Sequence, residues 1–315
     1  MKSRSHVFLL GGLGNQLFQY AFALFLKGGG NDVEVIFDLK RVRISENSKP
    51  DICQLVKQGS VSIKEGSSEG FLVRKLMNFT LRLSSTRTFV PIKFVNSILR
   101  VLLMVINKTS RRNESLIGFS NPGYIENLEL SEPKDYLGYF QSYRWASSPE
   151  VKENLKQSFL SLDSGLIKSF EMQSKGTSLL VVHLRIGDYV SDSRIGTLEK
   201  SYYLDAIQAM WATNLYTEIW AFSDSLDEAK NKLATDLDFP IRWIAPELAK
   251  PVELLGIMTL GKGFVLSNST FGWWAAFLSR TENPTVFVPD KWFKGIRDPI
   301  DLCPDTWTRR KAFFE

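Results

Sequence analysis

The sequence predicts an α/β protein whose second half forms a doubly wound, Rossmann-like domain. Short apolar runs rich in Val, Ile and Phe alternate with helical stretches, and the alternation is regular from residue 178 onward. Continuous apolar runs of this length are typical of strands that are buried on both faces of a parallel sheet. A chain of 315 residues is long enough for two domains or for one large α/β unit.

Strands and helices are expected to alternate along the chain. The expected strands are residues 6–10, 33–39, 178–184, 218–223, 241–245, 263–267 and 285–289. The expected helices are residues 15–27, 147–159, 199–211, 226–234, 251–259 and 271–279. A polar stretch at 173–177 separates the regular second half from a less regular first half. We therefore predict an N-terminal domain of residues 1–175 and a C-terminal domain of residues 176–315.

Composition and the N-terminal stretch exclude several classes of protein. The hydrophobic content of 44% and the charged content of 23% are those of a globular protein. Cys53 and Cys303 lie far apart with no other Cys or His near either, which excludes a disulfide framework and a zinc knuckle. Asn15, Gln16 and Gln19 interrupt the apolar N-terminal stretch, so we expect strand, turn and helix there and not a signal peptide. A cytoplasmic protein without a transmembrane segment is expected.

Residues 71–113 carry nine basic side chains and no Asp or Glu, together with many apolar residues. Such a segment is able to lie against an anionic membrane surface, where each nearby Lys or Arg contributes about 1 kcal/mol. A solvated basic face over buried helices is the alternative. The first interpretation predicts peripheral contact with the inner face of the membrane. No nucleic acid is expected as a partner.

The first candidate site is GGLGNQLFQYA at residues 11–21, between a strand and a helix. In open α/β sheets, ligands bind outside the carboxyl ends of the strands. The glycines, Gly14 among them, permit a tight turn, and the N–H groups at the helix start favour an anion. The spacing matches neither a Walker loop nor a complete GxGxxG, so a simple turn is an equal alternative. Asn15 and Gln16 either cap the helix or reach a ligand.

The second candidate site is VVHLRIGDYV at residues 181–190, where His183 and Arg185 end a strand on the same side. An Arg in this position offers a planar fork to two phosphate oxygens. Asp188 follows in the loop. The alternative is a core histidine with a structural Arg–Asp pair.

Two further motifs lie at strand ends. In FSDS at 222–225, Asp224 is a candidate partner for a ribose or base edge, or for the N-cap of the next helix. In SNSTFGWWAA at 267–276, hydroxyl and N–H groups at a helix start form an anion cradle. Asn268, Ser269 and Thr270 are candidate ligands there, because ordinary capping requires one Ser or Thr and not four polar residues.

A metal site is not expected. Asp236 and Asp238 form a DxD, but they precede a strand, at the end of the sheet opposite to the ligands. We interpret them as a solvated turn. The GKG at 261–263 also precedes a strand, so it is no phosphate loop.

Six motifs, in their order along the chain, resemble those of the α-1,2-fucosyltransferases of glycosyltransferase family 11. The motifs are GGLGNQLFQYA, YLGYFQSYRW at 136–145, HLRIGDY at 183–189, FSDS, SNSTFGWWAA and VPDKWF at 288–293. The resemblance implies a GT-B type fold, with two Rossmann-like domains facing a cleft. It implies transfer of L-fucose from GDP-fucose with inversion, without a metal or other cofactor, to the 2-hydroxyl of a galactose-type acceptor. A galactoside or lipid-linked oligosaccharide in surface polysaccharide or O-antigen synthesis would be that acceptor.

The resemblance also assigns roles to residues. Arg185 falls on the motif Arg that is expected at the β-phosphate of GDP, and His183 and Asp188 fall on the other fixed positions of that motif. Asp188 is the first candidate for a base that activates the acceptor, and His183 is the second. Ser269 and Thr270 fall in an element expected at the diphosphate.

Three further positions complete this comparison with the family. Glu253 lies near the position where relatives carry an acid for guanine, and Asn15 lies in the GNQ element that faces the donor from the other domain. Many members carry a second Arg where this chain has Ile186, which makes donor affinity the property in question. Two other functions therefore stay open: a non-catalytic nucleotide- or glycan-binding Rossmann protein, and a transferase that uses another nucleotide sugar.

Overall fold

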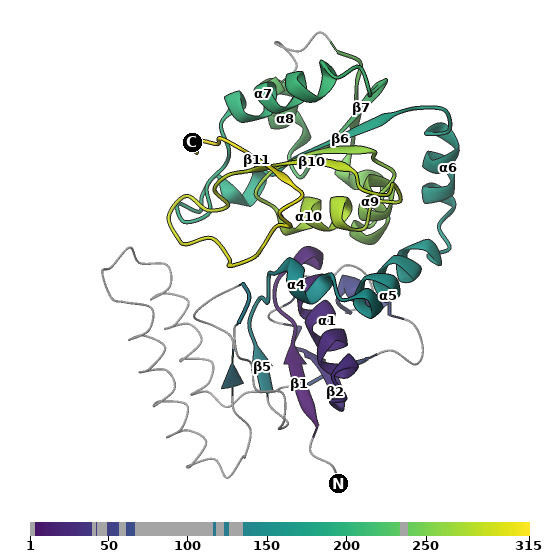
Figure 1. Cartoon of the computed structure of the whole chain (residues 1–315), viewed down its shortest axis with the longest axis vertical. Helices are drawn as coiled ribbons and strands as arrows, with labels where there is room; N and C mark the ends of the chain where they lie inside the picture. Colours follow the sequence, from purple (N-terminus) through teal and green to yellow (C-terminus); the bar gives the residue numbers. More distant parts are fainter. Residues whose placement is uncertain are drawn as a thin grey trace. The chain divides into compact units, whose positions relative to one another are not determined.

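The computed structural model of the chain describes residues 4–39, 42, 49–56, 61–66, 116–117, 123–125, 135–233 and 239–315 (Figure 1). The chain divides into two compact units, each with a parallel sheet. The first unit is Met1–Ser158 with Asp298–Cys303, and the second is Phe159–Arg297 with Pro304–Glu315. The α/β architecture with parallel sheets is confirmed. Residues 71–113, Asp236 and Asp238 lie outside the described residues.

The first unit contains a sheet in the order β3-β2-β1-β5-β4 with every pair parallel. The strands are β1 (Ser5–Phe8), β2 (Val33–Phe37), β3 (Ser62–Glu65), β4 (Leu116–Ile117) and β5 (Asp135–Leu137). The helices are α1 (Leu13–Gly28), η1 (Asp51–Gln54), α4 (Tyr143–Ala146) and α5 (Pro149–Leu160). Helix α1 is buried along most of its length, because its apolar residues face the core on nearly all sides. Strands β4 and β5 have only two and three residues, too few for sequence periodicity to detect, and β3 is missed because its residues SIKE form no apolar run.

The second unit contains a sheet in the order β11-β10-β9-β6-β7-β8, again parallel throughout. Its strands are β6 (Leu179–Leu184), β7 (Glu218–Ser223), β8 (Ile241–Ile244), β9 (Gly263–Leu266), β10 (Thr285–Pro289) and β11 (Thr308–Arg310). Its helices are α6 (Gly165–Gln173), η2 (Gly187–Tyr189), α7 (Lys200–Trp211), α8 (Leu226–Leu233), η3 (Pro246–Leu248), α9 (Pro251–Met258) and α10 (Thr270–Phe277). The strand order reverses direction between β6 and β9, and such switch points are where open sheets bind ligands.

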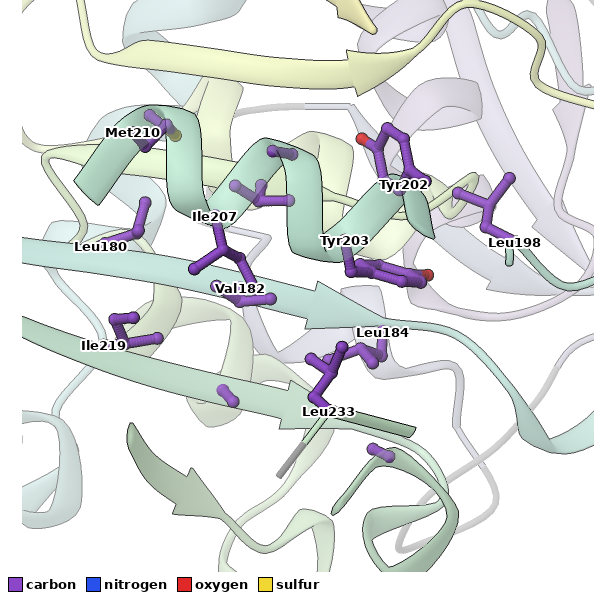
Figure 2. Close-up of a cluster of buried hydrophobic side chains, with 14 of the residues drawn as sticks. Leu180, Val182, Leu184, Leu198, Tyr202, Tyr203, Ile207, Met210, Ile219 and Leu233 are labelled. Atoms are coloured by element: carbon purple, nitrogen blue, oxygen red, sulfur yellow. The ribbon is translucent and has the colours of Figure 1, made fainter. Parts of the chain in front are cut away.

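The core of the second unit explains why its strands are continuous apolar runs. All six residues of β6 are buried. Leu180, Val182 and Leu184 contribute to a cluster that α7 and α8 complete (Figure 2). Side chains on the opposite face, such as Trp220 on β7, are also fully buried. A strand covered on both faces has no need for polar positions.

Helix α6 determines where the two units divide. The Phe170 ring on α6 packs edge-on against Trp220, with 5.3 Å between ring centroids. Ile167 lies so close to Gly256 on α9 that a Cβ there would be 2.7 Å from its Cδ1. The division after Ser158 falls near the end of α5 and before α6, whereas the sequence places it at residue 175. Within the described residues, no helix combines the length and apolar character needed to cross a membrane.

Candidate functional site

The carboxyl ends of three neighbouring strands bring most of the candidate residues of the second unit together. Strands β9, β6 and β7 are adjacent in the sheet. Arg185 follows β6, Asp224 follows β7, and residues 267–270 lead from β9 into α10. Their proximity follows from parallel pairing, which places all carboxyl ends at one edge.

Arg185 is held between two carboxylates at this edge. Its Nη2 donates to Asp188 Oδ1 at 2.7 Å, and its Nη1 lies 3.3 Å from Asp224 Oδ2. The guanidinium carbon lies 5.0 Å from the centroid of the Tyr189 ring. The Arg185 side chain is 18% exposed, and its Nε has no partner among the described residues. The site thus contains an oriented guanidinium with donor capacity left over.

Asp224 joins the two loops that follow β6 and β7. Its Oδ1 accepts the backbone N–H of Ile186 at 2.9 Å. A Cβ on Gly187 would overlap the other carboxylate oxygen, Oδ2, so the glycine is required for this close approach. The Ile186 side chain is 5% exposed and belongs to the same apolar cluster as Leu184. Ile186 thus packs its side chain in the apolar core, and its backbone N–H donates to the carboxylate of Asp224.

His183 is a core residue. It is 4% exposed, and its Nδ1 lies 3.0 Å from Ser267 Oγ. Burial, with the neighbouring charge of Arg185 as a second cause, lowers the pKa of His183 to about 3. A Cβ on Gly272 would lie 2.9 Å from Nδ1, so this glycine lets α10 approach β6 closely. A neutral, enclosed imidazole is poorly suited to take a proton from a substrate.

The polar residues before α10 make hydrogen bonds mainly to backbone groups of the protein. Ser269 is the N-cap, and its Oγ accepts the N–H of Phe271 at 3.3 Å. Asn268 is fully buried, and its Nδ2 donates to the carbonyl of Gly196 at 3.1 Å. Of the three candidates at this helix start, only Thr270 is partly exposed. The predicted cradle therefore presents Thr270 and the first turn of the helix, while Asn268 and Ser269 support it from within.

Glu253 occupies the first turn of α9 and binds two protein groups. Its Oε1 accepts from Ser164 Oγ at 2.6 Å, and its Oε2 accepts the backbone N–H of Lys250 at 3.2 Å. This is the bonding of a helix-capping carboxylate that also ties the start of α6 to α9. The sequence expectation of a guanine ligand did not include this role.

The carboxyl edge of the first sheet carries neutral amides. Gln19 accepts from the N–H of Leu10 and donates to the carbonyl of Gly138, each at 2.9 Å, so it ties together the loops after β1 and β5. Gln16 accepts the N–H of Ile52 at 3.2 Å and donates to the carbonyl of Gly11 at 2.9 Å.

Asn15 Oδ1 accepts from Gln141 Nε2 at 3.0 Å. The neighbouring Gly14 is buried in the first turn of α1. The sequence predicts no role for Gln141, although it lies in the motif at 136–145, and none for Tyr189 beside Arg185. Both residues lie inside the motifs, which is the signal that was available.

Metal-ligand side chains do not gather in the part of the chain that the structure describes. No group of three or more His, Cys, Asp or Glu residues with the proximity to hold a metal ion is found there. The expectation of a metal-independent reaction stays a prediction.

Comparison of the chain with known proteins identifies its family. The family model described as glycosyl transferase family 11 matches residues 125–294. An alpha-1,2-colitosyltransferase of Escherichia coli is 25% identical over 324 residues, covering 96% of this chain and 97% of the relative. The O-antigen biosynthesis glycosyltransferase WbnK of Escherichia coli is 27% identical over 320 residues, covering 95% and 98%. The fucosyltransferase NodZ from Bradyrhizobium, in its selenomethionine form, matches with a TM-score of 0.50 at 13% identity over 92% of this chain and 95% of that one. The GT-B type fold is thereby confirmed.

Proposed function

Because the chain belongs to glycosyl transferase family 11, we propose that it transfers L-fucose, or the related sugar colitose, from a GDP-linked donor to the 2-hydroxyl of a galactose-type acceptor. The observation that carries the proposal is the oriented Arg185 between Asp188 and Asp224, at the switch point of the second sheet. The family resemblance supplies the choice of GDP.

Arg185 suits the charge that develops in such a reaction. When GDP leaves the sugar, negative charge grows on the β-phosphate, and a pre-placed cation stabilises the transition state. In this proposal a phosphate oxygen replaces Asp188 on Nη2, since Asp188 is the more exposed of the two carboxylates, at 47% against 25% for Asp224. Thr270 and the first turn of α10 contact the second phosphate.

Asp188 is the group that we propose as the base for the acceptor hydroxyl. It is an exposed carboxylate within 2.7 Å of Arg185, and release of that contact by the diphosphate would free an oxygen for the hydroxyl. The burial of His183, the second candidate, favours Asp188 as the base and supports a packing role for His183 between β6 and α10.

The two proposed activities, transfer of L-fucose and transfer of colitose, differ in the donor sugar. The six sequence motifs resemble those of fucosyltransferases, whereas one relative over nearly the full chain is named an alpha-1,2-colitosyltransferase. Colitose is L-fucose without its 3-hydroxyl, so one hydroxyl distinguishes the two donors. A transferase that binds the 3-hydroxyl would reject the deoxy sugar strongly, because its own polar group would be left unpaired.

Two measurements test the proposal. Isothermal titration with GDP, UDP and ADP is expected to detect binding of GDP alone. Transfer from GDP-fucose and from GDP-colitose onto β-galactosyl acceptors is then measured in parallel, and a preference for one donor identifies the sugar. Absence of GDP binding would refute the proposal, and GDP binding without transfer or donor hydrolysis would favour a nucleotide-binding protein without catalysis.

A cytoplasmic role in O-antigen or another surface polysaccharide fits the proposal. One relative is named an O-antigen biosynthesis glycosyltransferase. A lipid-linked acceptor would bring the protein to the membrane surface, where the basic residues of 71–113 would bind anionic lipid. Co-sedimentation with anionic vesicles at low salt, and release at high salt, is the expected result.

A further inference from the structure

The motif YLGYFQSYRW, residues 136–145, begins in β5 and continues past the carboxyl edge of the first sheet, but it has no role in the proposed donor site. We propose that Gln141 in this motif is a positioning residue that holds the side-chain amide of Asn15 in one orientation. The inference rests on the proposed function, together with the family resemblance that implies that Asn15, in the GNQ element, faces the donor.

The contact joins two loops that parallel pairing brings together. Gln141 Nε2 donates to Asn15 Oδ1 at 3.0 Å, across 126 positions of sequence. Strands β1 and β5 are neighbours, so the turn before α1 and the segment after β5 both lie at the carboxyl edge. Gln141 is 5% exposed, and its Oε1 has no partner among the described residues. A buried amide oxygen without a hydrogen-bond partner lowers stability, so its presence in the folded chain calls for an explanation such as a functional role.

The backbone beside Gln141 adopts a conformation that needs support. Phe140 has φ of 49°, in the left-handed region that a bulky residue rarely enters. Its ring stacks on Phe22 of α1, with 4.1 Å between centroids and 6° between planes. Strained residues of this kind persist where the surrounding structure fixes them, and they gather at functional sites.

The returning segment 298–303 supplies a second support. Ser142 Oγ and the N–H of Tyr143 both donate to the carbonyl of Asp301 at 2.9 Å. Asp301 has φ of 53°, and its carboxylate pairs with Arg144 Nε at 2.7 Å. Gln141 is therefore placed between a stacked ring on one side and a braced turn on the other.

The bond determines which way the Asn15 amide faces. The carbonyl end is bound to Gln141, and the nitrogen end lies over Gly11, where a Cβ would be 2.8 Å from Nδ2. Gly11 also has φ of 73°, which favours glycine. With its oxygen bound to Gln141, the amide places its nitrogen beside the turn that precedes α1, and the nitrogen is the end that is able to donate to a sugar hydroxyl or phosphate oxygen.

A double-mutant cycle tests the inference in the full chain. Gln141→Met is expected to lower kcat/KM for the donor by roughly tenfold, as expected for loss of one orienting hydrogen bond. In an Asn15→Ala background the same change is expected to have less than about a twofold effect, because a residue that acts through Asn15 is silent without it. Gln157→Met, at an exposed helical glutamine bonded to Glu153, is the matched control and is expected to leave activity unchanged.

The outcomes separate this inference from the proposed function. Equal losses in both backgrounds would overturn the inference, because a general structural role lowers activity with or without Asn15. No loss in Gln141→Met, with a clear loss in Asn15→Ala, would overturn it as well. A wild-type protein that transfers neither sugar would instead refute the proposed function.

A crystal structure of Gln141→Glu tests the inference without any assay. The new carboxylate only accepts hydrogen bonds, so the Asn15 amide is expected to turn its nitrogen toward residue 141. An Asn15 side chain that keeps the same hydrogen-bond partners at both ends would overturn the inference. The reversed amide should also reproduce the activity loss of Asn15→Ala wherever transfer is measurable.

Discussion

The two sheets present different chemistry at equivalent edges. At the carboxyl edge of the second sheet, one guanidinium is held between two carboxylates, in the contacts of Arg185 with Asp188 and Asp224. At the carboxyl edge of the first sheet, neutral amides bind one another and the backbone, in the contacts of Asn15, Gln16 and Gln141. The same parallel topology thus carries an arginine held between two carboxylates in one unit and a pair of bonded amides in the other, where the Arg144–Asp301 ion pair lies in the adjoining turn.

This difference indicates that the two edges suit different chemical groups. Charged groups have their largest effect where charge develops, which suits the diphosphate of a nucleotide sugar. Amides donate and accept without charge, which suits orientation of neutral hydroxyls. Charged contacts also weaken as salt is added, whereas neutral ones do not. Ionic strength therefore distinguishes the two edges experimentally.

The largest effect is expected from Arg185→Ala. Loss of a cation that stabilises a developing oxyanion lowers kcat by at least about 10²-fold. Steady-state kinetics measure it, and GDP binding by the variant should lose most of its salt dependence. Arg194→Ala, in the loop that follows and paired with Asp192 at 2.6 Å, is the control and should stay within about twofold of wild type, as exposed ion pairs do. Near-normal turnover in Arg185→Ala would show that Arg185 does not stabilise the transition state.

Gly272→Ala is expected to act on stability. A Cβ 2.9 Å from His183 Nδ1 forces the buried ring or α10 to move, and such overpacking costs about 1–3 kcal/mol of unfolding free energy. Urea denaturation measures the loss. Gly165→Ala is the control, since a Cβ there meets nothing within 4 Å. Equal stability of the two variants would mean that the contact of α10 with β6 is looser than described.

Gly187→Ala probes the carboxylate that orients Arg185. The added methyl would displace Asp224, which also binds the N–H of Ile186, so KM for the donor should rise by roughly tenfold while the fold is kept. Kinetics with GDP-fucose, and circular dichroism as the check on folding, are the measurements. An unchanged KM would show that Asp224 need not hold its present position.

His183 should make stability depend on pH. Its pKa is lowered to about 3 in the folded protein, whereas an exposed imidazole in the unfolded chain titrates near 6.5. The unfolded state therefore binds more protons between these values, and the free energy of unfolding falls as pH is lowered below about 6.5, by up to about 1.4 kcal/mol per pH unit. Comparison of wild type with His183→Gln at pH 7 and 5.5 isolates this contribution. An equal change in unfolding free energy between the two pH values for both proteins would contradict the lowered pKa of His183.

The smallest expected effect is that of EDTA. If Arg185 and the first turn of α10 supply the positive potential, chelation should leave transfer unchanged. Rates measured with and without EDTA, then with added Mg²⁺ or Mn²⁺, provide the test. A strong loss restored by the metal would direct attention to Asp236 and Asp238, which lie outside the described residues.

Much of the second unit was predictable from sequence because its signals are local. Strand β6 is predicted at 178–184 and found at Leu179–Leu184, since a strand covered on both faces is apolar throughout. Helix α10 is predicted at 271–279 and found at Thr270–Phe277, with Trp273 and Trp274 fully buried. Strand β11 was not predicted, because its exposed basic residues carry no apolar pattern.

The first unit was less predictable because its organisation depends on distant contacts. Segment 298–303 packs with residues near 142, and nothing in either stretch indicates the other. Helix α6 has an ordinary amphipathic pattern that does not say which sheet it covers. Only its packing on Trp220 and Gly256 assigns it to the second unit.

The sequence by itself determined the order of strands and helices, the strand ends at which polar motifs lie, and the family that these motifs resemble. Tertiary structure decided which motif side chains are available to a ligand. Arg185 lies at the surface of the sheet edge, while His183, two residues earlier, is enclosed beneath α10. It also brought Gln141 to Asn15. The reason is physical: periodicity records which face of an element is apolar, whereas burial and hydrogen bonding depend on which distant element covers it.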